Sequence, residues 1–183
     1  ASARSDGNDI VFTASDGTTK LSYEIERFVK STGELVAWVK VPALSSTVDT
    51  VLYMYYGYPS ASKQEDAAGV WAGYEGVWHL KEASGSGAYI KDSTANAHDG
   101  TVAGTNFFTS GIIDGSREFT EALGEYIETN NGDVIFNGNS QFLFSFWICP
   151  NYRFDADWQA SSNEMVFFKL TSISTARLYR IAF

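Results

Sequence analysis

A loop rich in aspartate and asparagine carries the residues best suited to binding a cation. Asp92, Asn96 and Asp99 lie close together in it, with backbone carbonyl groups between them. Calcium takes six to eight oxygen ligands, which carboxylates, amides and carbonyls supply. The spacing is not that of an EF-hand, and Asp and Asn side chains also form turns by accepting hydrogen bonds from their own backbone. The loop therefore predicts a calcium site at these three residues, with an Asx-rich turn as the alternative.

A second loop carries the residues that suit a sugar ligand. Trp158 and Tyr152 stand in it beside Asp155 and Asp157. Sugar rings stack on exposed aromatic faces, whereas aromatic residues in strands usually fill the core. We predict a carbohydrate-binding site at these four residues. The alternative is that the loop tryptophan packs against the body of the domain. The tryptophans expected in strands, and therefore in the core, are Trp38, Trp78 and Trp147.

Two pairs of acids have spacings that invite comparison with glycoside hydrolases, which place two carboxyl groups across the scissile bond. Glu24 and Glu26 lie on one face of a predicted strand, without a third acid. Glu125 and Glu128 fall on opposite faces, because side chains alternate along a strand. We interpret all four as solvated surface charge, and predict no catalytic residue and no enzyme activity in this segment.

The remaining nucleophiles and bases are few. His79 falls in a predicted strand and is interpreted as a packing residue with its hydrogen bonds satisfied, and His98 falls in the Asx loop. Neither accompanies a nucleophile elbow. Cys149 is the single cysteine, so no disulfide forms within the chain, and its apolar surroundings predict a buried thiol.

The composition limits the partners. The chain has 183 residues, 44 % of them hydrophobic, and a formal charge of −9. This acidity disfavours nucleic acid and anionic membranes, whose binding depends on Lys and Arg. No apolar run is long enough to cross a membrane. Neutral sugars, cations or other proteins are the expected partners.

The elements that position these residues are predicted to be strands. Alternation predicts strands over 9–13, 21–29 and 35–41. Residues 50–56 are apolar on both faces, which predicts a central strand buried on both sides. Residues 60–71 have the composition of a helical turn or linker, so a domain boundary is placed near residue 72.

Beyond this boundary, short strands separated by Gly-rich loops predict a sandwich or jelly roll. They are expected over 76–80, 100–103, 117–120, 125–129, 141–149, 165–170 and 177–183. The chain is thus predicted to be all-β, with two β-sandwich units. Residues 1–71 look N-terminally truncated and residues 72–183 C-terminally truncated, so neighbouring chains or the rest of a longer polypeptide would complete the open sheet edges.

Two resemblances refine this picture. Residues 5–71 resemble the latter part of a bacterial and archaeal surface-protein family of unknown function. The motifs that carry the resemblance are Ser5–Thr13, Ser15–Thr18, Tyr23–Glu26, Val36–Pro42, Asp49–Gly57 and Val70–Trp71. Residues 74–183 are similar to the first part of a laminin-G-like, concanavalin-A-like lectin/glucanase jelly roll, through Gly76–Leu80, Asp92–Thr101, Gly115–Phe119 and Glu125–Glu128.

The resemblances imply an extracellular, cell-surface or virion-surface polypeptide. We expect a carbohydrate-binding or adhesion module whose partner is a glycan or surface polysaccharide. One alternative is a structural component of a filament, stalk or capsid-associated assembly, with self-association through the open edges. A second is part of a glycan-cleaving enzyme whose active site lies outside this segment.

Overall fold

The structure, a computed structural model, describes residues 2–87, 89–105, 107–119, 125–129, 143–149, 168–170 and 177–179. In these residues the chain is all-β, with strands paired antiparallel in twos and one helix of four residues. The chain divides into two compact units, Ala1–Asn130 and Asn131–Phe183. No helix among the described residues has the length and apolarity that a membrane span requires.

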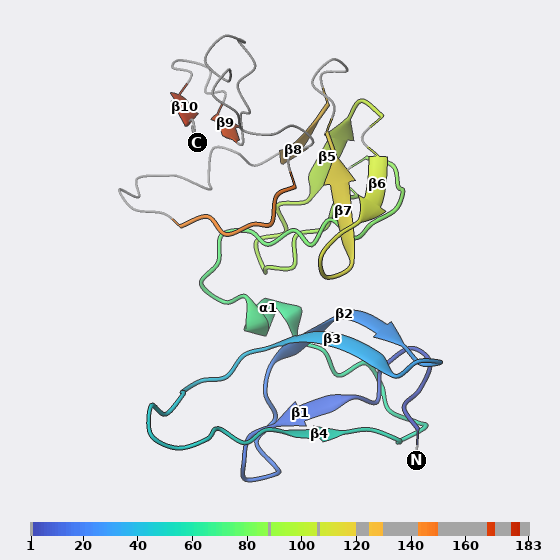
Figure 1. Cartoon of the computed structure of the whole chain (residues 1–183), viewed down its shortest axis with the longest axis vertical. Helices are drawn as coiled ribbons and strands as arrows, with labels where there is room; N and C mark the ends of the chain where they lie inside the picture. The colour runs from blue at the N-terminus through green and yellow to red at the C-terminus, as the bar shows by residue number, and fades with distance from the viewer. Residues whose placement is uncertain are drawn as a thin grey trace. The chain divides into compact units, whose positions relative to one another are not determined.

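The first pair of strands joins β1 (Val11–Thr13) to β4 (Tyr53–Tyr55), with Val11 opposite Tyr55 (Figure 1). The turn after β1 forms because the Asp16 carboxylate accepts hydrogen bonds from the backbone N–H groups of Thr18 and Thr19, at 2.9 and 2.8 Å. Gly17 supplies the positive φ of 74° that this turn requires.

The second pair joins β2 (Tyr23–Val29) to β3 (Glu34–Val39) through a tight turn in which Gly33 has a φ of 75°. The register shifts between Ile25 and Arg27, so Glu26 stands at an irregularity of the ladder. Such bulges re-aim side chains locally.

A short helix follows β4 and packs against β2. The helix α1 (Ala67–Val70) begins at Asp66, whose side chain accepts a 3.0 Å hydrogen bond from the Gly69 N–H group. Asp66 also accepts a 2.7 Å bond from the Ser22 hydroxyl, which fastens the helix to the start of β2. Among the residues that the structure describes, the buried apolar side chains are Ile10, Leu21, Tyr23, Val70 and Ile90.

The remaining strands are also antiparallel pairs. In the first unit, β5 (Gly100–Ala103) pairs with β8 (Tyr126–Thr129), and β6 (Phe107–Ser110) pairs with β7 (Gly115–Glu118). In the second unit, β9 (Phe168–Leu170) pairs with β10 (Arg177–Tyr179). The all-β prediction is therefore confirmed, whereas a closed sandwich or jelly roll stays a prediction.

Two strand predictions in the first unit are wrong. The strand predicted over 50–56 is short, and its side chains are exposed rather than buried, with Tyr55 at 49 %. The physical reason is that β1 is its single strand neighbour among the described residues. Residues 76–80 form no strand: Trp78 makes an isolated bridge to Asp92, and Leu80 has a φ of 59°, which ends extended geometry.

The strand predicted over 141–149 is also absent from its described part, 143–149. Trp147 is 78 % exposed and Cys149 is exposed, so the predictions of a core tryptophan and a buried thiol are wrong. An apolar residue in a strand is buried only when a neighbouring element covers it. No described strand pairs with this segment.

Candidate functional site

A histidine held between two buried glutamates is the main polar cluster of the first unit. Glu24 and Glu26 project from β2 and are 8 % and 7 % exposed. Nε2 of His79 lies 3.0 Å from Oε2 of Glu24, and Nδ1 lies 2.7 Å from Oε2 of Glu26. The imidazole therefore bridges two carboxylates through both of its nitrogen atoms. We call Glu24, Glu26 and His79 the carboxylate–imidazole bridge.

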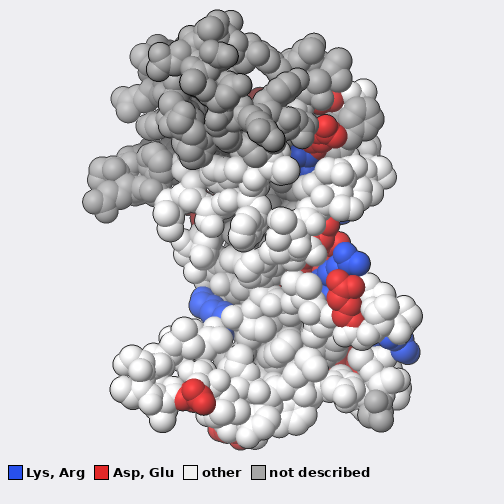
Figure 2. Space-filling view, viewed as in Figure 1, with Lys and Arg blue, Asp and Glu red and all other residues white. Residues whose placement is uncertain are grey.

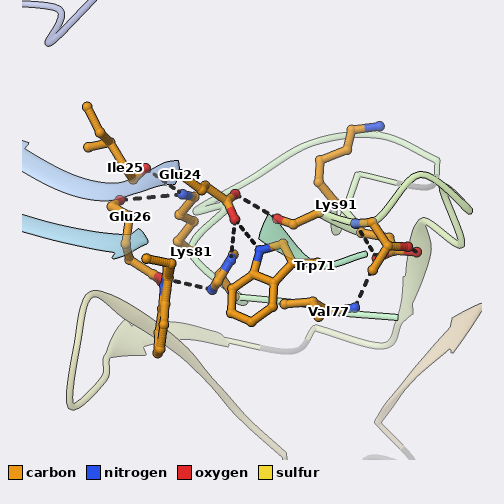
Figure 3. A network of polar contacts seen from close by, with 12 residues as sticks. Glu24, Ile25, Glu26, Trp71, Val77, Lys81 and Lys91 are labelled. Atoms are coloured by element: carbon orange, nitrogen blue, oxygen red, sulfur yellow. Dashed lines mark hydrogen bonds and ion pairs between the residues drawn. The ribbon is translucent and has the colours of Figure 1, made fainter. Parts of the chain in front are cut away.

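Neutral donors complete the hydrogen bonding of the two carboxylates (Figure 3). Glu24 accepts bonds from the Trp71 indole at 2.6 Å and from the Ser93 hydroxyl at 2.7 Å. Glu26 accepts a bond from the Trp38 indole. Buried charges are tolerated when they are paired and hydrogen-bonded in this way.

The aromatic rings that supply these donors also pack around the histidine. The His79 ring stacks on Trp38 with 6.0 Å between centroids and lies 5.8 Å from Trp71. The two indoles are 5.4 Å apart, and Tyr74 meets Trp71 edge-on. A protonated imidazole gains from aromatic faces at such distances.

The environment fixes the charges of the bridge. Burial opposes ionisation of Glu24, but hydrogen bonds from His79, Trp71 and Ser93 outweigh it and lower its pKa to about 2. Burial likewise opposes a charge on His79, but its bonds to Glu24 and Glu26 outweigh this and raise its pKa to about 9. The pKa of Glu26 is also lowered, because its bonds to His79 and Trp38 exceed the cost of burial. The bridge is thus an imidazolium between two carboxylates at neutral pH.

This arrangement is better suited to holding two segments of the fold together than to catalysis. A general acid or base works best with a pKa near the operating pH, and Glu24 and His79 are shifted away from it in opposite directions. Both nitrogen atoms of His79 are already engaged. The bridge therefore joins strand β2 to the segment that follows α1.

The interpretation of Glu24 and Glu26 as solvated surface charge is wrong, because His79 covers both carboxylates. The prediction of His79 as a packing residue with satisfied hydrogen bonds is confirmed. The sequence showed that Glu24 and Glu26, two residues apart on a strand, lie on the same face. A histidine inside the apolar run 76–80 was the other available signal, but nothing in the sequence connects the two across more than fifty residues.

The predicted calcium loop is organised around Asp92, which is 9 % exposed. Its Oδ1 accepts hydrogen bonds from the N–H groups of Val77 at 2.9 Å and Thr94 at 3.0 Å. Its Oδ2 accepts bonds from the Thr94 hydroxyl at 2.8 Å and the His98 N–H group at 2.9 Å. Both oxygen atoms therefore organise the loop backbone, as an Asx-type turn does.

The other two predicted ligands make similar internal bonds. Asp99 accepts from the Asp92 N–H group at 3.0 Å and pairs with Lys91 at 2.5 Å, and its pKa is lowered chiefly by Lys91. The Asn96 amide donates to the carbonyl oxygen of Glu75 at 3.0 Å. Within the described residues no group of three His, Cys, Asp or Glu side chains is arranged to hold a metal ion. Calcium at this loop stays a prediction.

Replacement of Asp92 tests its role in the loop. We expect Asp92→Ala to lower the free energy of unfolding by about 2–3 kcal/mol, because hydrogen bonds to a buried charged group contribute most. Asp99→Ala is the matched control, with an expected loss of roughly 1 kcal/mol, since its Lys91 partner is exposed. Urea unfolding followed by tryptophan fluorescence gives both values, and equal losses would contradict the central role of Asp92.

The predicted carbohydrate residues Trp158, Tyr152, Asp155 and Asp157 lie outside the described residues. The structure instead exposes aromatic residues in and after β4, of which those within 50–56 were expected to be buried. They are Tyr53, Tyr55, Tyr56 and Tyr58, between 46 % and 66 % exposed.

Comparison with known proteins gives one family match. No curated protein and no solved structure has significant similarity to the chain. The predicted resemblance to a family of unknown function is confirmed in that coarse form, whereas the laminin-G-like resemblance of residues 74–183 stays a prediction. Residues 6–86, less than half of the chain, match the family described as Domain of unknown function (DUF2341), and this range contains the whole carboxylate–imidazole bridge.

Proposed function

We propose that the chain is a carbohydrate-binding or adhesion module of a larger surface-exposed polypeptide. The observation that supports this is the exposure of four tyrosines in six residues, Tyr53 to Tyr58. An exposed aromatic ring does not contribute the stabilising free energy that its burial would provide. It does provide a flat face on which a sugar ring can stack.

The charge distribution agrees with a ligand that is not anionic. The formal charge of the chain is −9, and on the face in Figure 2 charged atoms form separate clusters within a mostly uncharged described surface. Nucleic acid and anionic lipid need a concentration of Lys and Arg instead.

The finer features of the proposal come from sequence resemblance. They are a laminin-G-like jelly roll in residues 74–183 and a cell-surface or virion-surface location, while the domain boundary near residue 72 rests on the composition of residues 60–71. The calcium site predicted at Asp92, Asn96 and Asp99 is not needed for the proposal, because both aspartates already accept hydrogen bonds from within the chain.

Affinity electrophoresis of the intact chain tests the proposal. We expect soluble neutral polysaccharides such as galactomannan, xyloglucan or mixed-linkage β-glucan to retard the native chain, with serum albumin as the unretarded control. Sedimentation velocity of the same samples follows the oligomeric state. A chain that no polysaccharide retards, but that self-associates with rising concentration, contradicts glycan binding and supports the structural-assembly alternative.

A further inference from the structure

An open groove beside β4 has the size and lining of a ligand site. Its volume is about 400 Å³, and the residues that line it include Asp9, Val11, Tyr55, Tyr56, Tyr58 and Gln64. Small-molecule sites usually enclose roughly 300–1,000 Å³ and combine aromatic walls with a few polar groups. We infer that this groove, here called the tyrosine groove, binds a segment of a neutral glycan, an inference that rests on the proposed function.

The aromatic wall supplies the binding surface. Tyr58 is 66 % exposed, and Tyr55 and Tyr56 are each 49 % exposed. The Tyr55 hydroxyl donates a 3.2 Å hydrogen bond to the Gly17 carbonyl, which limits the rotation of its ring. Tyrosine presents a large rigid face at a low cost in conformational entropy. Several such faces in one groove suit a chain of sugar rings.

The loop that carries Tyr58 is held in place by Arg4. Nη1 of Arg4 donates hydrogen bonds to the carbonyl oxygens of Pro59 at 2.9 Å and Ala61 at 2.8 Å. On the other side of Tyr58, the Gly57 N–H group donates a 2.6 Å bond to Oδ2 of Asp9. The groove is therefore organised before a ligand arrives, which reduces the ordering cost of binding.

Hydrogen bonds also hold the polar lining residue Gln64 in place. Lys20 donates from Nζ to the Gln64 backbone carbonyl at 2.6 Å and to the Gln64 side-chain oxygen at 3.2 Å. The Gln64 amide group donates to Ser62. These bonds fix the amide of Gln64 at the groove, where amides and hydroxyl groups match the hydroxyl groups of a sugar.

Charge selects against acidic glycans. Asp9 is the one charged residue in the lining of the groove. Burial opposes its ionisation, but backbone N–H donors from Arg4 and Gly57 outweigh burial and keep its pKa below the ordinary value. The Arg4 guanidinium is already paired with Asp6 at 2.6 Å. Asp9 is 3 % exposed, and the nearby Lys20 ammonium is engaged by the two Gln64 oxygen atoms, so a uronate or sulfate group would find no unengaged cation in the lining and would be opposed by the net charge of −9.

Two tyrosine variants test the groove. The probes are galactomannan, xyloglucan and mixed-linkage β-glucan, with alginate and heparin as acidic counterparts. We expect Tyr58→Ala to weaken binding of the neutral glycan that the parent chain binds by about tenfold, the effect of losing one stacking face. Tyr53→Ala is the matched control, because Tyr53 is an exposed tyrosine of β4 that does not line the groove. Its effect should stay below about twofold.

The outcomes separate the two proposals. Loss of binding in Tyr58→Ala alone supports the tyrosine groove. Binding of neutral glycan that both variants retain overturns the groove while leaving the proposed function standing. Equal binding of alginate or heparin overturns the charge selection, and binding of no glycan by the parent chain overturns both proposals. Thermal unfolding of each variant, expected to be unchanged at so exposed a position, confirms that each remains folded.

Discussion

The free energy of unfolding is expected to be highest between about pH 4.5 and 6.5 and to fall on both sides of that window. His79 has its ordinary pKa of 6.5 in the unfolded chain and about 9 in the folded one. Below pH 6.5 it is protonated in both states, so the stabilisation by its two carboxylates is fully present. As the pH rises towards 9, the folded chain must lose a proton that the bridge favours, and this stabilisation disappears.

The acid limb has the opposite sign. The pKa of Glu24 falls from 4.5 in the unfolded chain to about 2 in the folded one. Its contribution is therefore present above pH 4.5 and is lost as the pH falls towards 2. Glu26 and Asp16, whose pKa values are also lowered, add to this limb. Tyr23 adds a separate loss only above pH 10, because burial raises its pKa to about 12.

The measurement is a series of urea titrations at about pH 5.5, 7.5 and 9, with a loss of the order of 2–3 kcal/mol expected across the alkaline limb. Tryptophan fluorescence is the suitable signal, because Trp38 and Trp71 pack on His79. His79→Gln should remove the slope between pH 6.5 and 9. His98→Gln is the control, since its ring contacts the Glu75 carbonyl rather than a carboxylate. A slope that survives in His79→Gln would contradict the assignment.

The second large effect is expected from His79→Ala. This change leaves Glu24 and Glu26 buried without their shared cation, and breaking a buried ion pair by removing one partner costs about 3–5 kcal/mol. The loss should be measured near pH 6, where the bridge is fully formed. Lys81 also lowers the pKa of Glu26, but its Nζ donates to the backbone carbonyls of Ile25 and Glu26 rather than to a carboxylate, so it does not replace the ion pairs of His79.

Two further measurements separate loss of charge pairing from loss of packing. In His79→Ala the pKa values of both glutamates should rise, so the loss of stability should shrink as the pH falls below about 4.5. Adding Glu24→Gln and Glu26→Gln to His79→Ala should restore part of the stability, because the buried charges are gone. A loss that is independent of pH and unrelieved by the glutamine changes would show that packing against Trp38 and Trp71 is the whole effect.

Local sequence signals identified most of the elements correctly. Alternation over 21–29 and 35–41 corresponds to β2 and β3, because hairpins follow from short-range pattern and a turn glycine, here Gly33. The Asx loop around Asp92 was also recognisable, since its bonds lie mostly within a few residues. By contrast, burial of β4 was predicted from an apolar pattern, which indicates only what a strand would bury if another layer covered it.

The sequence by itself determined the all-β class, the acidic net charge, the hairpin β2–β3 and the Asx-rich character of the loop around Asp92. Only the tertiary structure decided that His79 lies between Glu24 and Glu26, that the Asp92 carboxylate accepts hydrogen bonds from within the chain, and that Tyr55, Tyr56 and Tyr58 line a groove. Local elements follow from propensities and periods within a few residues. Ionisation, burial and grooves instead depend on contacts between residues distant in sequence, which a periodic pattern does not encode.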